Sequence, residues 1–466
     1  MPPIPGPLRL PLLGNAWWVA KEGGSSRMVP MLRKMYARWG EVVSLGGLGE
    51  ETVVVFDPRV WAQVHAAAGP WPTGATDSLW MLHAFFEKRA RRGVREIAMA
   101  FGTDTWQATR SAMQRTLLSP QAAARYASSV DRVARRAAKE LAMSCGRIDL
   151  HRWLQQLSFD MVCGAVLGAP LPRPVDGGMH PLLAATVRSM ECASGMLMSP
   201  LGKKHATMRT RLWRDWQASL QFMVEHSKAD VARALGAPPA YGFSYAHDLV
   251  ESGAIDADAV AANMPGLLMA GFETVASTLH WTLIHLGSNP EAQATLRAEI
   301  AAVVGSDELS RGHVRRLRYL KAVQREVHRL TPTAFMFVRM LDEATEVVLG
   351  SGKALELPAS TWLAFSPTGV AHDPQHVESP ELFRPERFLS SNIDKSALIH
   401  HPLMRDGFSV GPRMCLGARG AHLELVAATA AVMQAVEVQC DATPWEIHNH
   451  ASTYPSPAPQ LSFRVL

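Results

Sequence analysis

One pattern near the C-terminus constrains this chain more than any other feature, because it places a cysteine, two glycines and an arginine at fixed spacing. It is the segment FSVGPRMCLGARGAHLE, whose core spans residues 408–417. Cys415 stands in a predicted turn just before a helix, where the N-terminal N–H groups favour a thiolate over a thiol. Gly411 and Gly417 remove side chains where a backbone or a flat ligand has to come close.

Two further side chains complete the pattern. Phe408 can shield the sulfur, and Arg413 can pair with a carboxylate. A thiolate in an apolar pocket lined by N–H groups is what haem iron takes from an axial cysteine. The alternative is a buried structural cysteine, which is common for a lone cysteine but does not explain the whole pattern.

This loop resembles the haem-binding loop of the cytochrome P-450 family, and further motifs follow in the family's order over the whole chain. The resemblance implies a mainly α fold with a small β region. Residues 1–30 would be a proline-rich entry segment and residues 31–466 a single haem-binding domain. It implies haem b held by the Cys415 thiolate, O2 as co-substrate, and a monooxygenase that inserts one oxygen atom into a hydrophobic substrate.

The composition agrees with a large globular protein. Hydrophobic residues make up 47% of the 466 residues, which excludes disorder for most of the chain. A net charge of +5 is too small to indicate nucleic-acid binding. The five cysteines are widely spaced without a CxxC pair, which argues against a disulfide framework or a zinc site. No run reaches ~18 apolar residues, so no membrane-spanning helix is expected, and the first residues show no leader pattern.

Local patterns predict the order of helices and strands. The stretch EVVSLGGLGEETVVVFDP predicts two strands and a turn, and residues 104–345 are dominantly helical. Strands return over 333–365, and a long irregular segment covers 372–412, which is typical of functional loops. A last helix is predicted from Leu416 to Gln439, followed by a β-like tail.

The EVHR motif places a carboxylate and a guanidinium on one helix face. Glu326 and Arg329 are three residues apart and can pair, as in many ordinary helices. By resemblance, Arg387 in the downstream FRPERF completes a buried cluster with them. That cluster would support the irregular segment near the haem loop and would do no chemistry.

The stretch AGFETVAST carries the predicted oxygen chemistry. Gly271 thins the helix where the flat cofactor and a bound diatomic could lie against it. The acid Glu273 stands next to the hydroxyl of Thr274, a pair suited to proton delivery. In isolation, Glu273 could be a surface charge and Thr274 a local helix bend. By resemblance, Thr274 is the oxygen-activating threonine and Glu273 its acidic neighbour. Upstream, Pro265 and Gly266 are expected to interrupt and kink this helix.

Four side chains are candidates for the haem propionates. Trp106 and Arg110 in WQATR match the family's W-x-x-x-R, and Arg339 falls where another propionate-binding arginine is expected. Singly, such residues mostly cover surfaces. With Arg413 they give three guanidiniums for two carboxylates.

Basic residues near the EVHR motif indicate a branch of the family. Lys321 and Arg325 are four residues apart, and Arg419 follows Cys415 by four. They resemble the mitochondrial-type branch, where such cations dock an acidic 2Fe-2S ferredoxin of the adrenodoxin kind. The alternative is a solvated basic helix face. Resemblance to this branch implies that the protein lies peripherally on the matrix side of the inner mitochondrial membrane. A soluble cytoplasmic location is the other candidate.

Two apolar segments, TPTAFMFV and GLLMAGF, would border the substrate by resemblance, which indicates a sterol, steroid, terpenoid or fatty acid. The predicted pocket residues are Leu267, Ala270, Ala334, Phe335, Met336 and Phe337. The basic and apolar segment PLGKKHATMRTRLW could touch a membrane surface or be a plain exposed loop.

Two other functions compete with the monooxygenase. One is a haem-thiolate isomerase or dehydratase that acts on a peroxide without external electrons. The other is a non-catalytic haem-binding sensor. The acid–threonine pair and the basic face favour the monooxygenase over both.

Overall fold

The computed structural model describes residues 4–11, 13–47, 50–69, 80–90, 104–144, 148–175, 177–197, 199, 201–253, 255–389, 397–449 and 452–466. The chain forms two compact units. The first comprises Met1–Leu79, Arg325–Cys415 and Pro444–Ala458, and the second comprises Trp80–Gln324, Leu416–Thr443 and Pro459–Leu466. The division into an entry segment and a single domain therefore stays a prediction.

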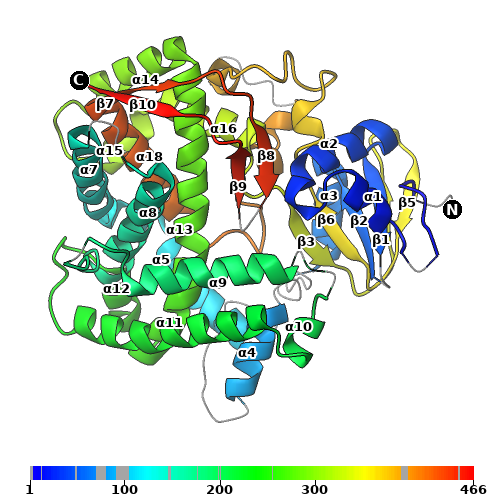
Figure 1. The fold of residues 1–466 in the computed structure, drawn as a ribbon, viewed down its shortest axis with the longest axis horizontal. Helices are drawn as coiled ribbons and strands as arrows, with labels where there is room; N and C mark the ends of the chain where they lie inside the picture. The colour runs from blue at the N-terminus through cyan, green and yellow to red at the C-terminus, as the bar shows by residue number, and fades with distance from the viewer. Residues whose placement is uncertain are drawn as a thin grey trace. The chain divides into compact units, whose positions relative to one another are not determined.

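The first unit is built on a four-stranded sheet with the order β1-β2-β6-β3. Its strands are β1 (Val42–Gly47), β2 (Glu50–Val55), β6 (Trp362–Phe365) and β3 (Phe337–Met340). β1 and β2 are the two predicted strands and pair antiparallel, β6 runs parallel to β2, and β3 runs antiparallel to β6. The apolar faces of α2 (Met28–Trp39) and α3 (Pro58–Ala67) pack on this sheet (Figure 1).

The remaining elements of the first unit are short. They are α1 (Ala16–Lys21), η1 (Ser25–Arg27), β4 (Thr345–Val348), β5 (Ala354–Leu357), η3 (Val370–His372), η4 (Pro385–Phe388), η6 (Leu398–His400), α17 (Pro402–Arg405), β8 (Glu446–Asn449) and β9 (Thr453–Ser456). Where the structure describes it, at 372–389 and 397–412, the predicted irregular segment consists of loops and single helical turns. α16 (Arg318–Leu330) carries the EVHR motif and enters this unit at Arg325.

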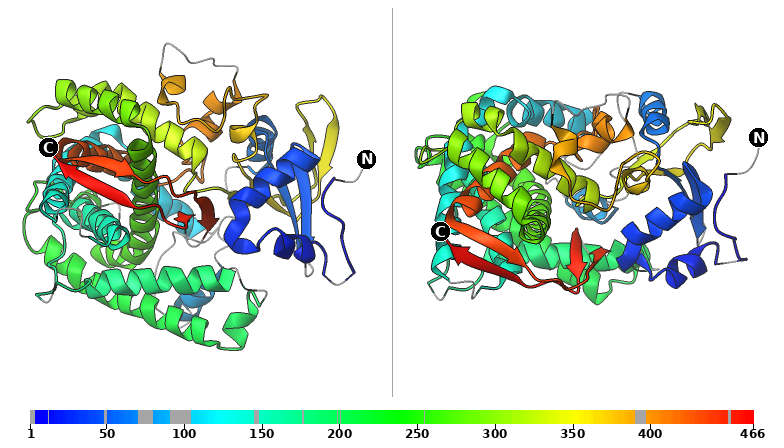
Figure 2. Two further views of the ribbon diagram at one scale, coloured as in Figure 1. Left: turned by 45° about the horizontal axis from the view of Figure 1, so that its top comes forward. Right: turned by 90° about the horizontal axis from the view of Figure 1, so that it is seen from above.

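The second unit is helical. Its helices are α4 (Trp80–Ala90), α5 (Asp104–Leu117), α6 (Pro120–Arg125), α7 (Ala127–Met143), α8 (Leu150–Leu167), α9 (Pro181–Leu197), α10 (Lys204–Thr207), α11 (Arg211–Leu235), α12 (Tyr245–Glu251), α13 (Ala257–Ser288), α14 (Pro290–Val303), α15 (Arg311–Arg316) and α18 (Ala418–Ala435). α8, α11 and α18 contact the long α13, and α9 lies beside α11 (Figures 1 and 2). An apolar sequence on nearly all sides suits α13 to this central position.

Two expectations from the sequence are wrong. The last helix ends at Ala435, and residues 436–440 form β7 (Val436–Cys440), which pairs antiparallel with β10 (Leu461–Val465). Alternating valines in VEVQC fit this strand once β10 supplies its partner. Pro265 and Gly266 do not interrupt α13, which continues through both, while the expected kink stays a prediction. Pro265 is buried, so packing around the helix offsets the lost hydrogen bond.

Among the helices that the structure describes, none is long and apolar enough to cross a membrane.

Candidate functional site

The cysteine loop is a closed turn at the start of a helix. The Cys415 amide donates to the Phe408 carbonyl at 2.9 Å, and Gly411 has a φ of +75°, which favours glycine. Gly417 is the N-cap residue of α18, so the cysteine precedes the 18-residue helix by three positions. Cys415 is exposed. The helix dipole at this end favours its thiolate.

Arg339 lies in the same unit as the cysteine loop and has hydrogen-bond donors that lack an acceptor among the described residues. Its side chain is buried on β3, and its Nη1 donates to the Val338 carbonyl at 2.7 Å. Its Nε and Nη2 are buried without a hydrogen-bond partner among the described residues. Burial and the charge of Arg413 lower the pKa of Arg339 to about 10. The positive charges of Arg339 and Arg413 and the unsatisfied donors of Arg339 suit an anionic ligand. The carboxylates of haem would be such a ligand.

No motif in the sequence points to His65, which the structure adds to this set. His65 lies on α3, and its Nδ1 is 3.4 Å from where a side chain on Gly411 would begin. Its Nε2 is buried and lacks a partner among the described residues. Burial and the charge of Arg339 lower the pKa of His65 to about 4. The neutral imidazole therefore stands beside the cysteine loop near physiological pH.

Thr274 lies on a face of α13 that the rest of the second unit leaves open. Its hydroxyl donates to the Ala270 carbonyl at 2.8 Å, and both residues are exposed. Leu267, one turn earlier, is half-buried. Residues three and four apart share a helix face, so a hydroxyl and two apolar side chains are presented together.

Glu273, the predicted acid, does not share the open face of α13 with Thr274. Glu273 is buried, and its Oε2 accepts from Gln155 Nε2 on α8 at 3.2 Å. Gly271 faces α8 too, because a Cβ there would lie 2.9 Å from the Val162 side chain. This glycine therefore lets α8 and α13 approach closely. The predicted roles of Gly271 at the cofactor and of Glu273 in proton delivery stay predictions.

The Glu–Arg–Arg cluster forms in the first unit. Glu326 accepts two hydrogen bonds of 2.8 Å from Arg329 and one of 3.0 Å from Arg387. Arg329 also donates to the carbonyls of Ala371 and Pro380, at 2.8 and 2.7 Å. Arg329, held by the buried Glu326 carboxylate, thereby fixes the backbone at Ala371 and at Pro380.

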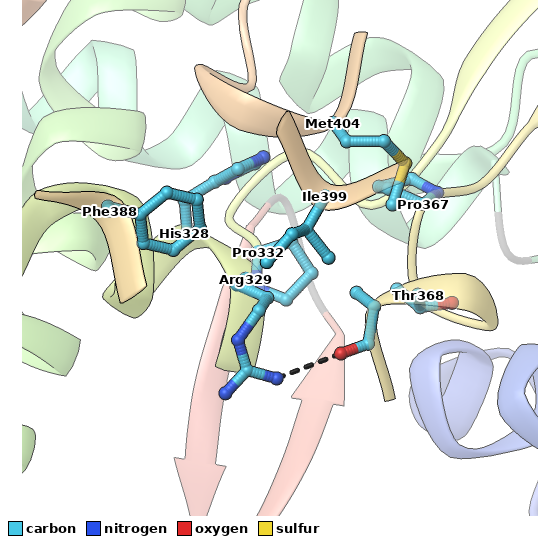
Figure 3. Close-up of a pocket in the computed structure, with 9 residues that line it drawn as sticks. His328, Arg329, Pro332, Pro367, Thr368, Phe388, Ile399 and Met404 are labelled. Atoms are coloured by element: carbon cyan, nitrogen blue, oxygen red, sulfur yellow. Dashed lines mark hydrogen bonds between the residues drawn. The ribbon is translucent and has the colours of Figure 1, made fainter. Parts of the chain in front are cut away.

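A small cavity adjoins this cluster. It measures about 10 Å³, and its lining includes His328, Arg329, Pro332, Thr368, Phe388 and Met404 (Figure 3). Pockets for organic ligands have volumes of roughly 300 Å³ or more. The cavity is therefore part of the support under the loop and is too small for a substrate.

The other predicted site residues are placed as follows. The side chain of Trp106, on α5, lies outside the described residues, and Arg110 Nε donates to Gln114 at 3.3 Å. Ala334 is half-buried, and Phe335, Met336 and Phe337 pack against the apolar core of the first unit.

Of the predicted docking cations, Arg325 pairs with Asp406 at 2.9 Å. Arg419 is exposed on the first turn of α18, and Lys321 is half-buried on α16. Arg325 therefore already contacts a carboxylate of its own chain.

Comparison with known proteins identifies a family and several relatives. The family model for cytochrome P450 matches residues 4–463. The mitochondrial 1,25-dihydroxyvitamin D(3) 24-hydroxylase of Mus musculus is 26% identical over 99% of this chain and 88% of its own. The mitochondrial 25-hydroxyvitamin D-1 alpha hydroxylase of Homo sapiens is 29% identical over 94% and 87%. The mitochondrial sterol 26-hydroxylase of Homo sapiens is 31% identical over 48% and 42%.

Proposed function

Because the chain belongs to the cytochrome P450 family and is a haem-thiolate monooxygenase, we propose that it hydroxylates a sterol-class substrate with electrons from an acidic 2Fe-2S ferredoxin. Bound haem would supply the site at which O2 is reduced and its O–O bond cleaved. The observation that carries the proposal is the cysteine loop. Its Cys415 sulfur lies at the N-terminal end of α18, in the same unit as the orphaned donors of Arg339.

The chain's own residues account for the remaining requirements. Leu267 and Ala270 offer an apolar surface on α13, and the half-buried Phe335 and Met336 offer another in the first unit. The Thr274 hydroxyl, which donates to the Ala270 carbonyl, would pass a proton to reduced oxygen. The relatives named as vitamin D and sterol hydroxylases support a sterol-class substrate.

The proposed electron donor is acidic. Lys321, Arg325 and Arg419 are the cations that would receive it, and charge complementarity of this kind steers association. The three relatives compared are named as mitochondrial proteins, which supports a ferredoxin donor and a place on the matrix side of the inner membrane.

The segment between α9 and α11 is the proposed membrane contact. Leu197, Leu201 and Met208 are large apolar side chains with exposed fractions of 45%, 37% and 63%. Lys203 and Lys204 stand among them, and both are exposed. Apolar and basic side chains together favour an anionic lipid surface.

A carbon monoxide difference spectrum followed by reconstituted turnover tests the function. Reduced protein should give the red-shifted Soret band of a thiolate-ligated haem, and Cys415→Ser should abolish it. With ferredoxin, its reductase and NADPH, a sterol panel should give hydroxylated product. Product from a peroxide substrate without NADPH would instead establish the isomerase alternative, and a thiolate band with no turnover of any lipophilic compound would favour a sensor.

A further inference from the structure

His65 holds a fixed position next to the cysteine loop. Its ring meets the Trp61 ring edge to face at 5.9 Å. On another side it meets Gly411, whose Cβ position would be 3.4 Å from Nδ1. The imidazole is thus oriented by α3 on one side and by the loop on the other.

Three buried polar atoms in this region lack a hydrogen-bond partner. His65 Nε2, Arg339 Nε and Arg339 Nη2 are all buried, and none has a hydrogen-bond partner among the described residues. Burial and neighbouring arginines cause the lowered pKa values of His65 and Arg339, and no carboxylate of the described chain is among these causes. Buried polar groups left unsatisfied are costly, so this arrangement suits an acceptor that the described residues do not supply.

We propose that His65 is a positioning residue for the cofactor, donating a hydrogen bond from Nε2 to the haem carboxylate that Arg339 also binds. The neutral ring with its proton on Nε2 makes this bond without adding a third charge beside Arg339 and Arg413. The carboxylate then has a guanidinium from β3 and an imidazole from α3. The inference depends on haem binding, which the carbon monoxide spectrum tests on its own.

The test measures haem loss from purified holoprotein to an excess of an apoprotein haem acceptor. His65→Phe keeps an aromatic ring against Trp61 but removes the donor, so haem should leave roughly tenfold faster, as expected for one hydrogen bond to a charged group. The resonance Raman bands of the haem propionates should shift as well. His65→Gln, which keeps an amide donor, should restore much of both.

Reconstitution with haem dimethyl ester separates this role from packing. Esterifying both carboxylates leaves only an uncharged carbonyl acceptor, so the difference in haem loss between wild-type protein and His65→Phe should become much smaller. His376→Phe, the same change at another half-buried histidine of the first unit, is the matched control and should leave the rate unchanged. Unaltered haem loss in His65→Phe would overturn the proposal. So would a difference that is equally large with the diester, because the histidine would then act through packing and not through the charged carboxylate.

Discussion

Arg325 Nε donates to Asp406 Oδ1 at 2.9 Å, joining the helix predicted to receive the electron donor to the segment that leads into the cysteine loop. Asp406 also accepts from Arg405 Nε at 2.7 Å. Burial raises the pKa of Asp406, but the hydrogen bond from Arg405 and the charge of Arg325 outweigh it and lower the pKa overall. A carboxylate on an acidic partner would therefore compete with Asp406 for Arg325.

Asp406→Asn is expected to strengthen the interaction with ferredoxin. Removing the internal carboxylate frees the charge of Arg325 for the donor, so the KM for ferredoxin should fall a few fold at low salt, the scale of one partly exposed ion pair. Lys321→Ala, which removes a docking cation, should raise that KM. Steady-state turnover at two salt concentrations measures both variants. An unchanged or higher KM in Asp406→Asn, with a normal haem spectrum, would show that Arg325 does not meet the donor.

Thr274→Ala should keep the haem and its spectrum but lose the coupling of electrons to product. The hydroxyl that the Ala270 carbonyl now orients is gone, so proton delivery becomes indiscriminate and product per NADPH should fall about tenfold or more. Thr274→Ser, which keeps the hydroxyl, is the control. NADPH consumption, hydrogen peroxide and product are measured in parallel for both variants and wild type. If Thr274→Ala forms as much product per NADPH as wild type, the threonine does not take part in proton delivery.

Glu326→Gln should destabilise the first unit strongly. The carboxylate is fully buried and pairs with Arg329 and Arg387. Neutralising it leaves two guanidiniums without their counter-charge, at a cost of roughly 3–5 kcal/mol. A large drop in Tm and poor haem retention are expected. Glu378→Gln, at an exposed carboxylate that pairs with Arg384, should change Tm little. A Tm near wild type in Glu326→Gln would show that the cluster is not essential.

The parts of the site that could be predicted from the sequence are those whose residues lie close together in the chain at fixed spacing. The cysteine loop and the Glu326–Arg329 pair lie within single local segments, so their geometry follows from a turn or a helix. His65 and Gly411 are brought together by tertiary packing, and no local pattern reports that. Arg325 and Asp406 are 81 residues apart for the same reason.

Local spacing alone does not show which way a side chain faces or which strand a segment pairs with. Glu273 and Thr274 are neighbours in sequence, yet one faces α8 and the other an open face, because successive helical residues point about 100° apart. The strand β7 depends on β10, which comes 21 residues later and cannot be seen from a helical pattern that runs into it.

The buried Glu424 on α18 is expected to make stability depend on pH. Burial raises the pKa of Glu424 to about 8, against an ordinary value of 4.5. Between pH 4.5 and about 8, the folded protein therefore keeps the proton on Glu424 while the unfolded chain loses it. Stability from this group is fully present below pH ~4.5 and declines as pH rises through about 8, by up to a few kcal/mol.

Glu424→Gln removes this titration while keeping a side chain of similar shape. The variant should unfold at a higher temperature than wild type at pH 8 and at nearly the same temperature at pH 5. Thermal unfolding followed by circular dichroism across this range measures the difference. Glu225→Gln, at an exposed position on α11, should leave the profile unchanged. If wild type and Glu424→Gln keep parallel profiles from pH 5 to pH 8, the carboxyl is ionised in the folded protein, and a cation or donor must compensate its burial.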